Sequence, residues 1–143
     1  MRHIIAGLGL LAVWGALAHA QDSGDGPSTI PDNTPPTAEK CAAVYGAFAQ
    51  DQANFGASDS LLGERYSNYM RISFDDRLNQ LAGKAEKNVS DLKGATDTER
   101  AALYMKLVDA ETEGEMDAQV VRDMIRLSDS CDDEFGFSPS LGS

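Results

Sequence analysis

After residue 20 the sequence contains no histidine and no tryptophan. His3, His19 and Trp14 all fall within the first twenty residues. If that segment is removed, no imidazole remains to serve as a general base, to complete a Ser-His-Asp or Cys-His arrangement, or to bind zinc, copper or haem. The sequence also lacks a CxxC pair and a glycine-rich phosphate loop after a strand, which excludes thioredoxin-like redox chemistry, covalent haem attachment and this mode of nucleotide binding. We therefore predict that the protein is not an enzyme, with no catalytic residues, no cofactor and no metal ligands.

Residues 1–20 have the three parts of a cleavable export signal. Arg2 and His3 give a weakly positive start, an apolar run follows from Ile4 to Leu17, and the segment ends in the small-x-small pattern Ala-His-Ala at 18–20. The apolar run is shorter than the roughly twenty residues that a membrane-spanning helix needs. The pattern predicts a protein that acts in the periplasm or the extracellular medium, with no membrane attachment after cleavage.

Basic residues are few. The chain has 12 Lys and Arg against 23 Asp and Glu, and loss of Arg2 with the signal leaves 11 against 23, a net charge of −12. Such a chain repels phosphate backbones and anionic lipid surfaces, so we expect no nucleic-acid or membrane partner. The charge also keeps an exported protein soluble without any partner. A charged partner, if there is one, should be a basic protein.

Cysteine is limited to Cys41 and Cys131, which lie 90 positions apart. Two cysteines in an exported chain indicate one structural disulfide, because the compartment is oxidising. Closing a loop of that length stabilises a domain by roughly 4–5 kcal/mol on the loop-entropy model.

Proline is almost confined to one segment, since residues 21–36 hold four of the five prolines and few apolar side chains. We interpret this segment as a disordered tether rich in Pro, Gly and Asp, and residues 136–143 as a flexible tail. The folded part is then a single domain at 37–135.

Within that domain the apolar residues recur with a helical period, and no alternating stretch of strand length competes. A first helix ends at Gly56, with Ser58 or Asp59 placed to cap the next. The second extends over 59–93 and stops at Gly94, either continuous or broken at Gly83. The third starts at a capping box, Thr96 to Glu99, and the fourth carries the apolar side chains between Val120 and Phe135. The predicted fold class is all-α, a four-helix up-down-up-down bundle closed by one disulfide.

The cysteine positions support this helix count. Cys41 lies at the start of the first predicted helix and Cys131 near the end of the fourth. In an alternating bundle with an even number of helices these two points lie at the same end, close enough to form a disulfide. A full reversal at Gly83 would add a helix and break this agreement.

The acidic run at 109–117 is the feature that most resembles a site. From Asp109 it offers oxygen side chains at the first, third, fifth, seventh and ninth positions, with Gly114 at the sixth, and so it resembles an EF-hand calcium loop. Val120 stands where that loop needs its bidentate glutamate, and no second loop is present. The run is then either a solvated turn between helices, relieved of like-charge repulsion by a break at Gly114, or a weak site for a divalent cation.

The remaining candidates are apolar or charged surfaces. Four methionines and four tyrosines on the apolar stripes are interpreted as core residues, with the tyrosine hydroxyls at the rim: Met70, Met105, Met116, Met124, Tyr45, Tyr66, Tyr69 and Tyr104. Residues 107–134 hold ten acids and only two bases, so this segment is predicted to form the most anionic surface.

We expect a non-catalytic binding or scaffold protein; the alternatives are an acidic inhibitor or chaperone of a basic partner, and a bundle that binds a divalent cation at 109–117 or a small apolar ligand.

Overall fold

The computed structural model describes residues 34–56 and 59–143. The predicted signal at 1–20 and most of the predicted tether at 21–36 lie outside these residues. Within them the chain forms five helices and no strand: α1 (Ala38–Phe55), α2 (Leu61–Arg65), α3 (Phe74–Lys84), α4 (Val89–Glu113) and α5 (Gln119–Phe135). Helix α1 begins directly after Thr37, whose side chain caps it by accepting a hydrogen bond from the Lys40 amide.

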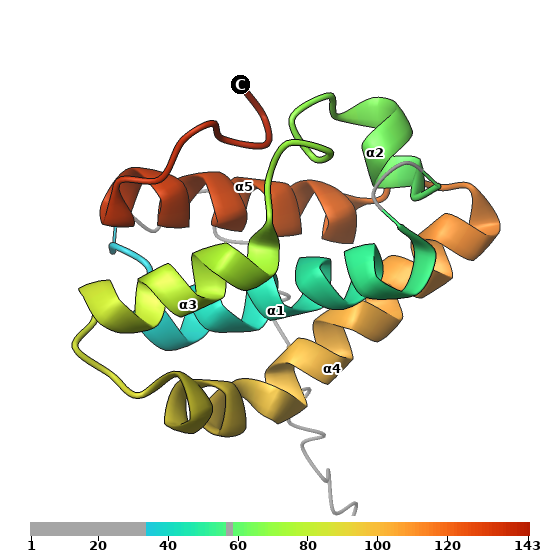
Figure 1. Ribbon diagram of the computed structural model, residues 1–143. Coiled ribbons are helices and arrows are strands. Elements are labelled where there is room, and N and C mark those ends of the chain that lie inside the picture. Colours follow the sequence, from blue (N-terminus) through green and yellow to red (C-terminus); the bar gives the residue numbers. More distant parts are fainter. Residues whose placement is uncertain (1–33, 57–58) are drawn as a thin grey trace, which may run out of the picture. The chain divides into compact units, whose positions relative to one another are not determined.

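The four longer helices run alternately in opposite directions, as Figure 1 shows for α1, α3, α4 and α5. Helix α2 is a short segment in the connection from α1 to α3. The prediction of an all-α four-helix bundle is therefore confirmed. The alternating order brings the start of α1 and the end of α5 together, and there Cys41 and Cys131 form the predicted disulfide, with their Cα atoms 5.6 Å apart.

Helix α1 is the central element, because it packs against α3, α4 and α5. A helix covered by three neighbours is buried on most of its circumference, and all residues from Cys41 to Phe48 are buried. The rings of Phe48, Tyr69 and Phe74 occupy the middle of the core, with centroids 5.0 to 6.1 Å apart. Their geometry is tilted or edge-on, as aromatic pairs prefer.

The predicted continuous helix over 59–93 is wrong, because the chain reverses within it. Helix α2 ends at Arg65, and residues 66–73 cross back over α1 without forming a helix. Their backbone is held by the side-chain amide of Gln52, which donates to the carbonyl oxygens of Tyr69 (3.0 Å) and Ile72 (2.8 Å). These hydrogen bonds join residues about twenty positions apart, so the periodicity of the sequence does not indicate them. The chain reverses again after Lys84, which confirms the alternative of a break near Gly83.

Helix α4 begins earlier than predicted and runs through Gly94. Asn88 caps it, accepting a hydrogen bond from the Ser90 amide at 2.8 Å. Thr96 is not a cap but a buried residue inside the helix, and its hydroxyl donates to the Leu92 carbonyl oxygen at 2.9 Å. Glycine inside a helix lowers stability by about 1 kcal/mol relative to alanine. The side chains buried on both sides of Gly94 contribute more than this to stability. The added reversal near Gly83 and the absent one at Gly94 offset each other, so the number of long helices remains even.

The predicted flexible tail at 136–143 instead packs on the helices. Leu141 is 2% exposed, and the Phe137 ring lies edge-on to that of Tyr45. The Asp129 carboxylate accepts hydrogen bonds from the amides of Leu141 and Gly142, at 2.9 and 3.1 Å. The folded domain therefore extends beyond 135 to the end of the chain.

Two predictions about core side chains also need correction. Met116 and Met124 are buried, but Met70 and Met105 are more than half exposed. Tyr66 and Tyr104 are partly buried, as expected of tyrosines at the rim. The hydroxyl groups of Tyr45 and Tyr69 are buried, where each meets a buried carboxylate.

Candidate functional site

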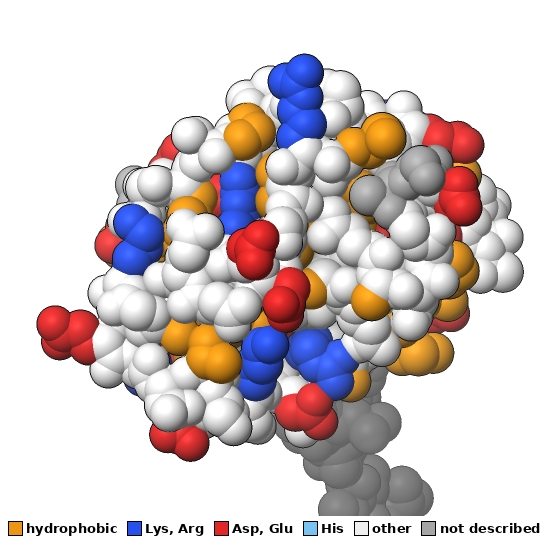
Figure 2. Space-filling model, in the orientation of Figure 1, with side chains coloured by type: hydrophobic (Ala, Val, Ile, Leu, Met, Phe, Trp, Pro, Cys, Tyr) orange, Lys and Arg blue, Asp and Glu red, His pale blue; other side chains and the backbone are white. Residues whose placement is uncertain are grey.

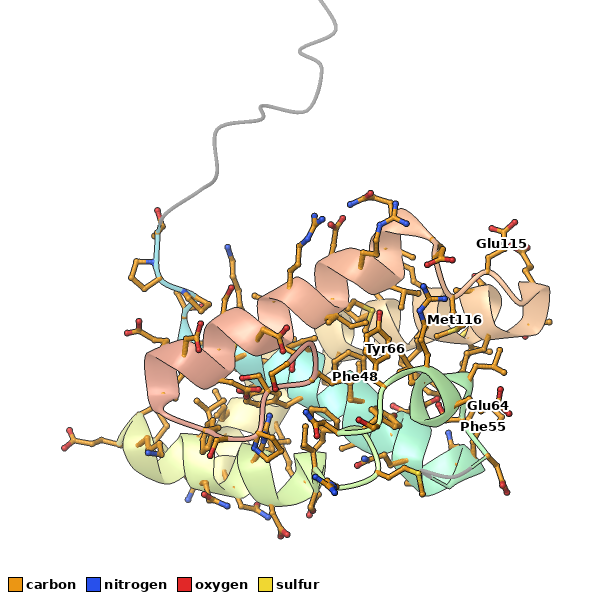
Figure 3. The ribbon with its side chains drawn as sticks, turned by 90° about the horizontal axis from the view of Figure 1, so that it is seen from above. Phe48, Phe55, Glu64, Tyr66, Glu115 and Met116 are labelled. Carbon is orange, nitrogen blue, oxygen red and sulfur yellow. A yellow bond between two sulfur atoms is a disulfide. The ribbon has the colours of Figure 1, made fainter. Side chains whose placement is uncertain are left out.

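The candidate site is a shallow surface groove between α2 and the turn that joins α4 to α5. It consists of two adjoining hollows of about 410 and 430 Å³. Leu61 and Met116 contribute apolar side chains, and Figure 3 shows Met116 and Glu115 on the turn and Glu64 on α2 at this end of the molecule. The residues that line the groove are Leu61, Glu64 and Arg65 from α2, and Gly114 to Ala118 from the turn.

The turn has its shape because α4 ends at Gly114, which adopts a left-handed conformation with φ of 70°. The break predicted at Gly114 is thus confirmed. An ion pair between Arg65 and Asp117 joins the two walls of the groove, and Arg122 also donates to the backbone oxygen of Asp117.

The charge around the groove is predominantly negative. Arg65 is engaged by Asp117, whereas Glu64, Glu113 and Glu115 are exposed and form no ion pair with any described residue. Phe55, at the end of α1, is 43% exposed and lies at the same end of the molecule (Figure 3). The groove therefore combines an apolar floor with uncompensated carboxylates at its edge.

A buried polar cluster connects this groove to the core. The Tyr69 hydroxyl donates to Asp51 at 2.5 Å, and the Ser60 hydroxyl donates to Glu111 at 2.9 Å. Ser60 is also the cap of α2, where its side chain accepts from the Leu62 amide, so it takes the place that the sequence assigned to Ser58 or Asp59. Asp59 is not the cap, and Ser58 lies outside the described residues. The cluster therefore ties the start of α2 to α4.

Burial shifts the pKa values in this cluster. Removal from water raises the pKa of Glu111 above its ordinary value, and the neighbouring Asp51 carboxylate raises it further, while the Ser60 hydroxyl lowers it. Burial also raises the pKa of Tyr69, with its hydrogen bond to Asp51 as the second cause. Tyr69 is therefore a neutral donor.

A second buried cluster lies at the disulfide end. Asp132 accepts two hydrogen bonds from Arg77, at 2.6 and 2.7 Å, and one from the Tyr45 hydroxyl at 2.6 Å. Burial raises the pKa of Asp132, although Tyr45 and Arg77 both favour the ionised carboxylate. Arg77 also donates to the carbonyl oxygen of Pro139, so this cluster holds the tail in place.

The acidic run at 109–117 does not form a loop of the EF-hand type. Its first five residues belong to α4, and only the part from Gly114 is a turn. Glu111 is half-buried in the cluster with Ser60, so it is turned away from the exposed carboxylates. No group of three or more acidic or cysteine side chains is placed to hold a metal ion in the part of the chain that the structure describes.

The ten acids of 107–134 are dispersed rather than gathered on one surface. Asp132 is buried, Asp129 binds the tail, and Asp117 and Asp123 form ion pairs. The exposed carboxylates that remain are Asp109 and Glu113 on α4, Glu115 in the following turn, and Asp133 and Glu134 near the end of α5. On the face seen in Figure 2, acidic and basic side chains are interspersed.

Asp51 and Ser60 are not among the residues predicted from the sequence, although one signal for Asp51 is present. Asp51 lies at core spacing between Phe48 and Phe55 on α1. A carboxylate on an apolar stripe is costly unless it is hydrogen-bonded, so this position itself indicates a buried polar cluster.

No protein-family model matches the chain, and no curated protein or solved structure is significantly similar to it. Among the described residues, no helix combines the length and apolar character needed to cross a membrane.

Proposed function

We propose that the protein acts outside the cytoplasm as a small non-catalytic binding protein, and that the groove between α2 and the α4–α5 turn binds a basic segment of a partner protein. The observation that carries this proposal is the uncompensated negative charge around an apolar floor. Glu64 and Glu115 stand on opposite walls of the groove, and neither has a cation among the described residues. A segment that places lysine or arginine beside one apolar side chain complements both features.

The export pattern and the disulfide support the location in this proposal. A disulfide between Cys41 and Cys131 suits an oxidising compartment. The lining of the groove supports a binding role, since the side chains around it include no hydroxyl, thiol or imidazole. The alternative of a small apolar ligand is less well supported, because three other hollows among the described residues open to solvent and each is lined by several charged side chains.

The experiment is a fluorescence anisotropy titration with a labelled synthetic peptide of lysine and spaced leucines. The test protein carries Glu64→Gln and Glu115→Gln. Its matched control carries Asp133→Asn and Glu134→Gln, which change the net charge equally at the far end of α5. We expect the groove variant to lose about tenfold in affinity, equivalent to roughly 1.4 kcal/mol, and the control to bind as the unaltered protein does.

Salt dependence separates site binding from general attraction. Affinity of the unaltered protein should fall as salt is added, and less steeply in the groove variant, because two charge contacts are gone. Equal losses in the two variants would mean that the peptide responds only to net charge, and the proposal would be wrong.

A further inference from the structure

Asp51, on α1, has one buried carboxylate oxygen without a hydrogen bond to any described residue. Asp51 is fully buried, and its Oδ2 accepts from the Tyr69 hydroxyl at 2.5 Å. Its Oδ1 is buried and has no donor among the described residues. No lysine or arginine forms an ion pair with Asp51 in this part of the chain. A buried acceptor left without a donor is costly, and in a carboxylate the cost is larger.

The Glu111 carboxyl lies next to the Asp51 carboxyl. It is within hydrogen-bonding reach of the Asp51 carboxyl, and one of its own oxygens accepts from Ser60 at 2.9 Å. Two ionised carboxylates have only acceptors to offer each other, and their charges repel. One proton between them removes the repulsion and supplies the missing donor.

We propose that Glu111 carries a proton that it donates to Oδ1 of Asp51, and that this shared proton positions α2, and with it one wall of the groove. Each atom then has a partner. The protonated oxygen of Glu111 bonds Asp51, the other accepts from Ser60, and Tyr69 satisfies the second oxygen of Asp51. Ser60 caps α2, so the hydrogen bonds run without interruption from α1 through α4 to the groove wall.

The groups around the pair do not supply a cation that would remove the need for the proton. Asp51 faces Glu111 from α1, and Tyr69 faces the pair from the segment between α2 and α3. On α2, Arg65 is engaged by Asp117, and Glu64 carries the same sign as the pair. In the α4–α5 turn, Glu115 is also negative. Arg65, the cation that lines the groove, is thus held by Asp117, and the carboxylates of Glu64 and Glu115 favour the protonated form of the pair.

The sign of the pH dependence follows from the raised pKa of Glu111. The folded protein holds this proton at pH values where the unfolded chain, with an ordinary pKa of about 4.5, has released it. The proton therefore contributes its full stabilisation below the pKa of the unfolded chain. This stabilisation is lost as the pH rises through the higher pKa of the folded state. Over that interval the folding equilibrium constant falls by up to about tenfold for each pH unit.

The test compares Glu111→Gln with Glu113→Gln. Glutamine at 111 donates to Asp51 and accepts from Ser60 at every pH, so it imitates the protonated acid. Glu113 is exposed two positions along α4, and its substitution is the matched control for loss of one charge. The measurement is denaturant unfolding at several pH values between about 4 and 8, a range that includes the ordinary glutamate pKa.

We expect the stability of the unaltered protein and of Glu113→Gln to fall as the pH rises. The stability of Glu111→Gln should fall less steeply, because the raised pKa of Asp132 still gives a slope of the same sign, and it should exceed that of the unaltered protein at neutral pH. If Glu111→Gln shows the same pH slope as Glu113→Gln, Glu111 holds no proton and the proposal is overturned. If Glu111→Gln is as unstable as Glu111→Ala at all pH values, glutamine does not replace the shared proton, which also overturns it.

The effect on binding rests on the proposed function, whereas the shared proton does not. With the lysine and leucine peptide, the affinity of Glu111→Gln relative to the unaltered protein should rise with pH. If the stability of Glu111→Gln depends less on pH than that of Glu113→Gln, but the peptide binds neither Glu111→Gln nor the unaltered protein, the shared proton is supported and the proposed function fails.

Discussion

Arg77 of α3 and Asp132 of α5 form a buried ion pair with two hydrogen bonds, at 2.6 and 2.7 Å. The two side chains are 7% and 0% exposed. The guanidinium also lies 5.7 Å from the centres of the Phe74 and Phe137 rings, one on α3 and one in the C-terminal tail. A single arginine thus joins α3, α5 and the tail beside the disulfide.

Replacing this arginine should be strongly destabilising. Arg77→Met leaves Asp132 buried without its cation, and such a loss costs about 3–5 kcal/mol. The free energy of unfolding in denaturant measures it. Arg71→Met, at an exposed arginine before α3, should change stability by less than about 0.5 kcal/mol. The double variant Arg77→Met with Asp132→Leu should recover much of the loss. Equal effects at the two arginines would contradict the structural role of the pair.

The C-terminal tail should contribute to stability as a core element does. Leu141→Ala removes a side chain that is 2% exposed, so we expect a loss of about 2–5 kcal/mol. Met105→Ala shortens an apolar side chain that is 56% exposed and should have little effect. Thermal unfolding compares them. A tail that does not pack on the helices would make the two substitutions equivalent.

The disulfide between Cys41 and Cys131 can be tested on the unaltered protein. Labelling of free thiols in the unreduced, denatured protein should detect none, because both cysteines are joined. Replacing both with alanine should cost about 2–5 kcal/mol. Detection of two thiols would refute the disulfide.

The two buried tyrosines should not ionise in the folded protein. Burial and a carboxylate partner raise the pKa values of Tyr45 and Tyr69. At an alkaline pH where the protein is still folded, tyrosinate absorbance should therefore be lower than in denatured protein at the same pH. The difference should vanish in Tyr45→Phe with Tyr69→Phe and persist in Tyr66→Phe. Equal absorbance before and after denaturation of the unaltered protein would contradict the buried hydrogen bonds.

The sequence predicted what depends on local periodicity and on the cysteines. The helical period of the apolar residues before Gly56 indicated α1, and Gly56 and Gly114 marked helix ends correctly. The pairing of Cys41 with Cys131 followed from their positions in an alternating bundle.

What the sequence did not predict depends on contacts between distant residues. The Gln52 side chain binds the backbone of residues 69 and 72, and so it interrupts a stripe that has a helical period. Arg77 and Asp129 fix a tail whose composition is typical of a flexible segment. The groove arises only when α2 meets the α4–α5 turn, about fifty positions away in the sequence, so its members share no motif.

The most direct test of the proposed binding groove is a map of the peptide's contacts by nuclear magnetic resonance. The lysine and leucine peptide is titrated into isotope-labelled protein at moderate salt, and shifts of the backbone amides are followed. We predict that the largest changes occur at residues 61–65 and 114–118, on the two walls of the groove. Changes of similar size around Asp133 and Glu134, or spread over the whole surface, would show binding by general charge alone and would contradict the assignment of this groove as the binding site.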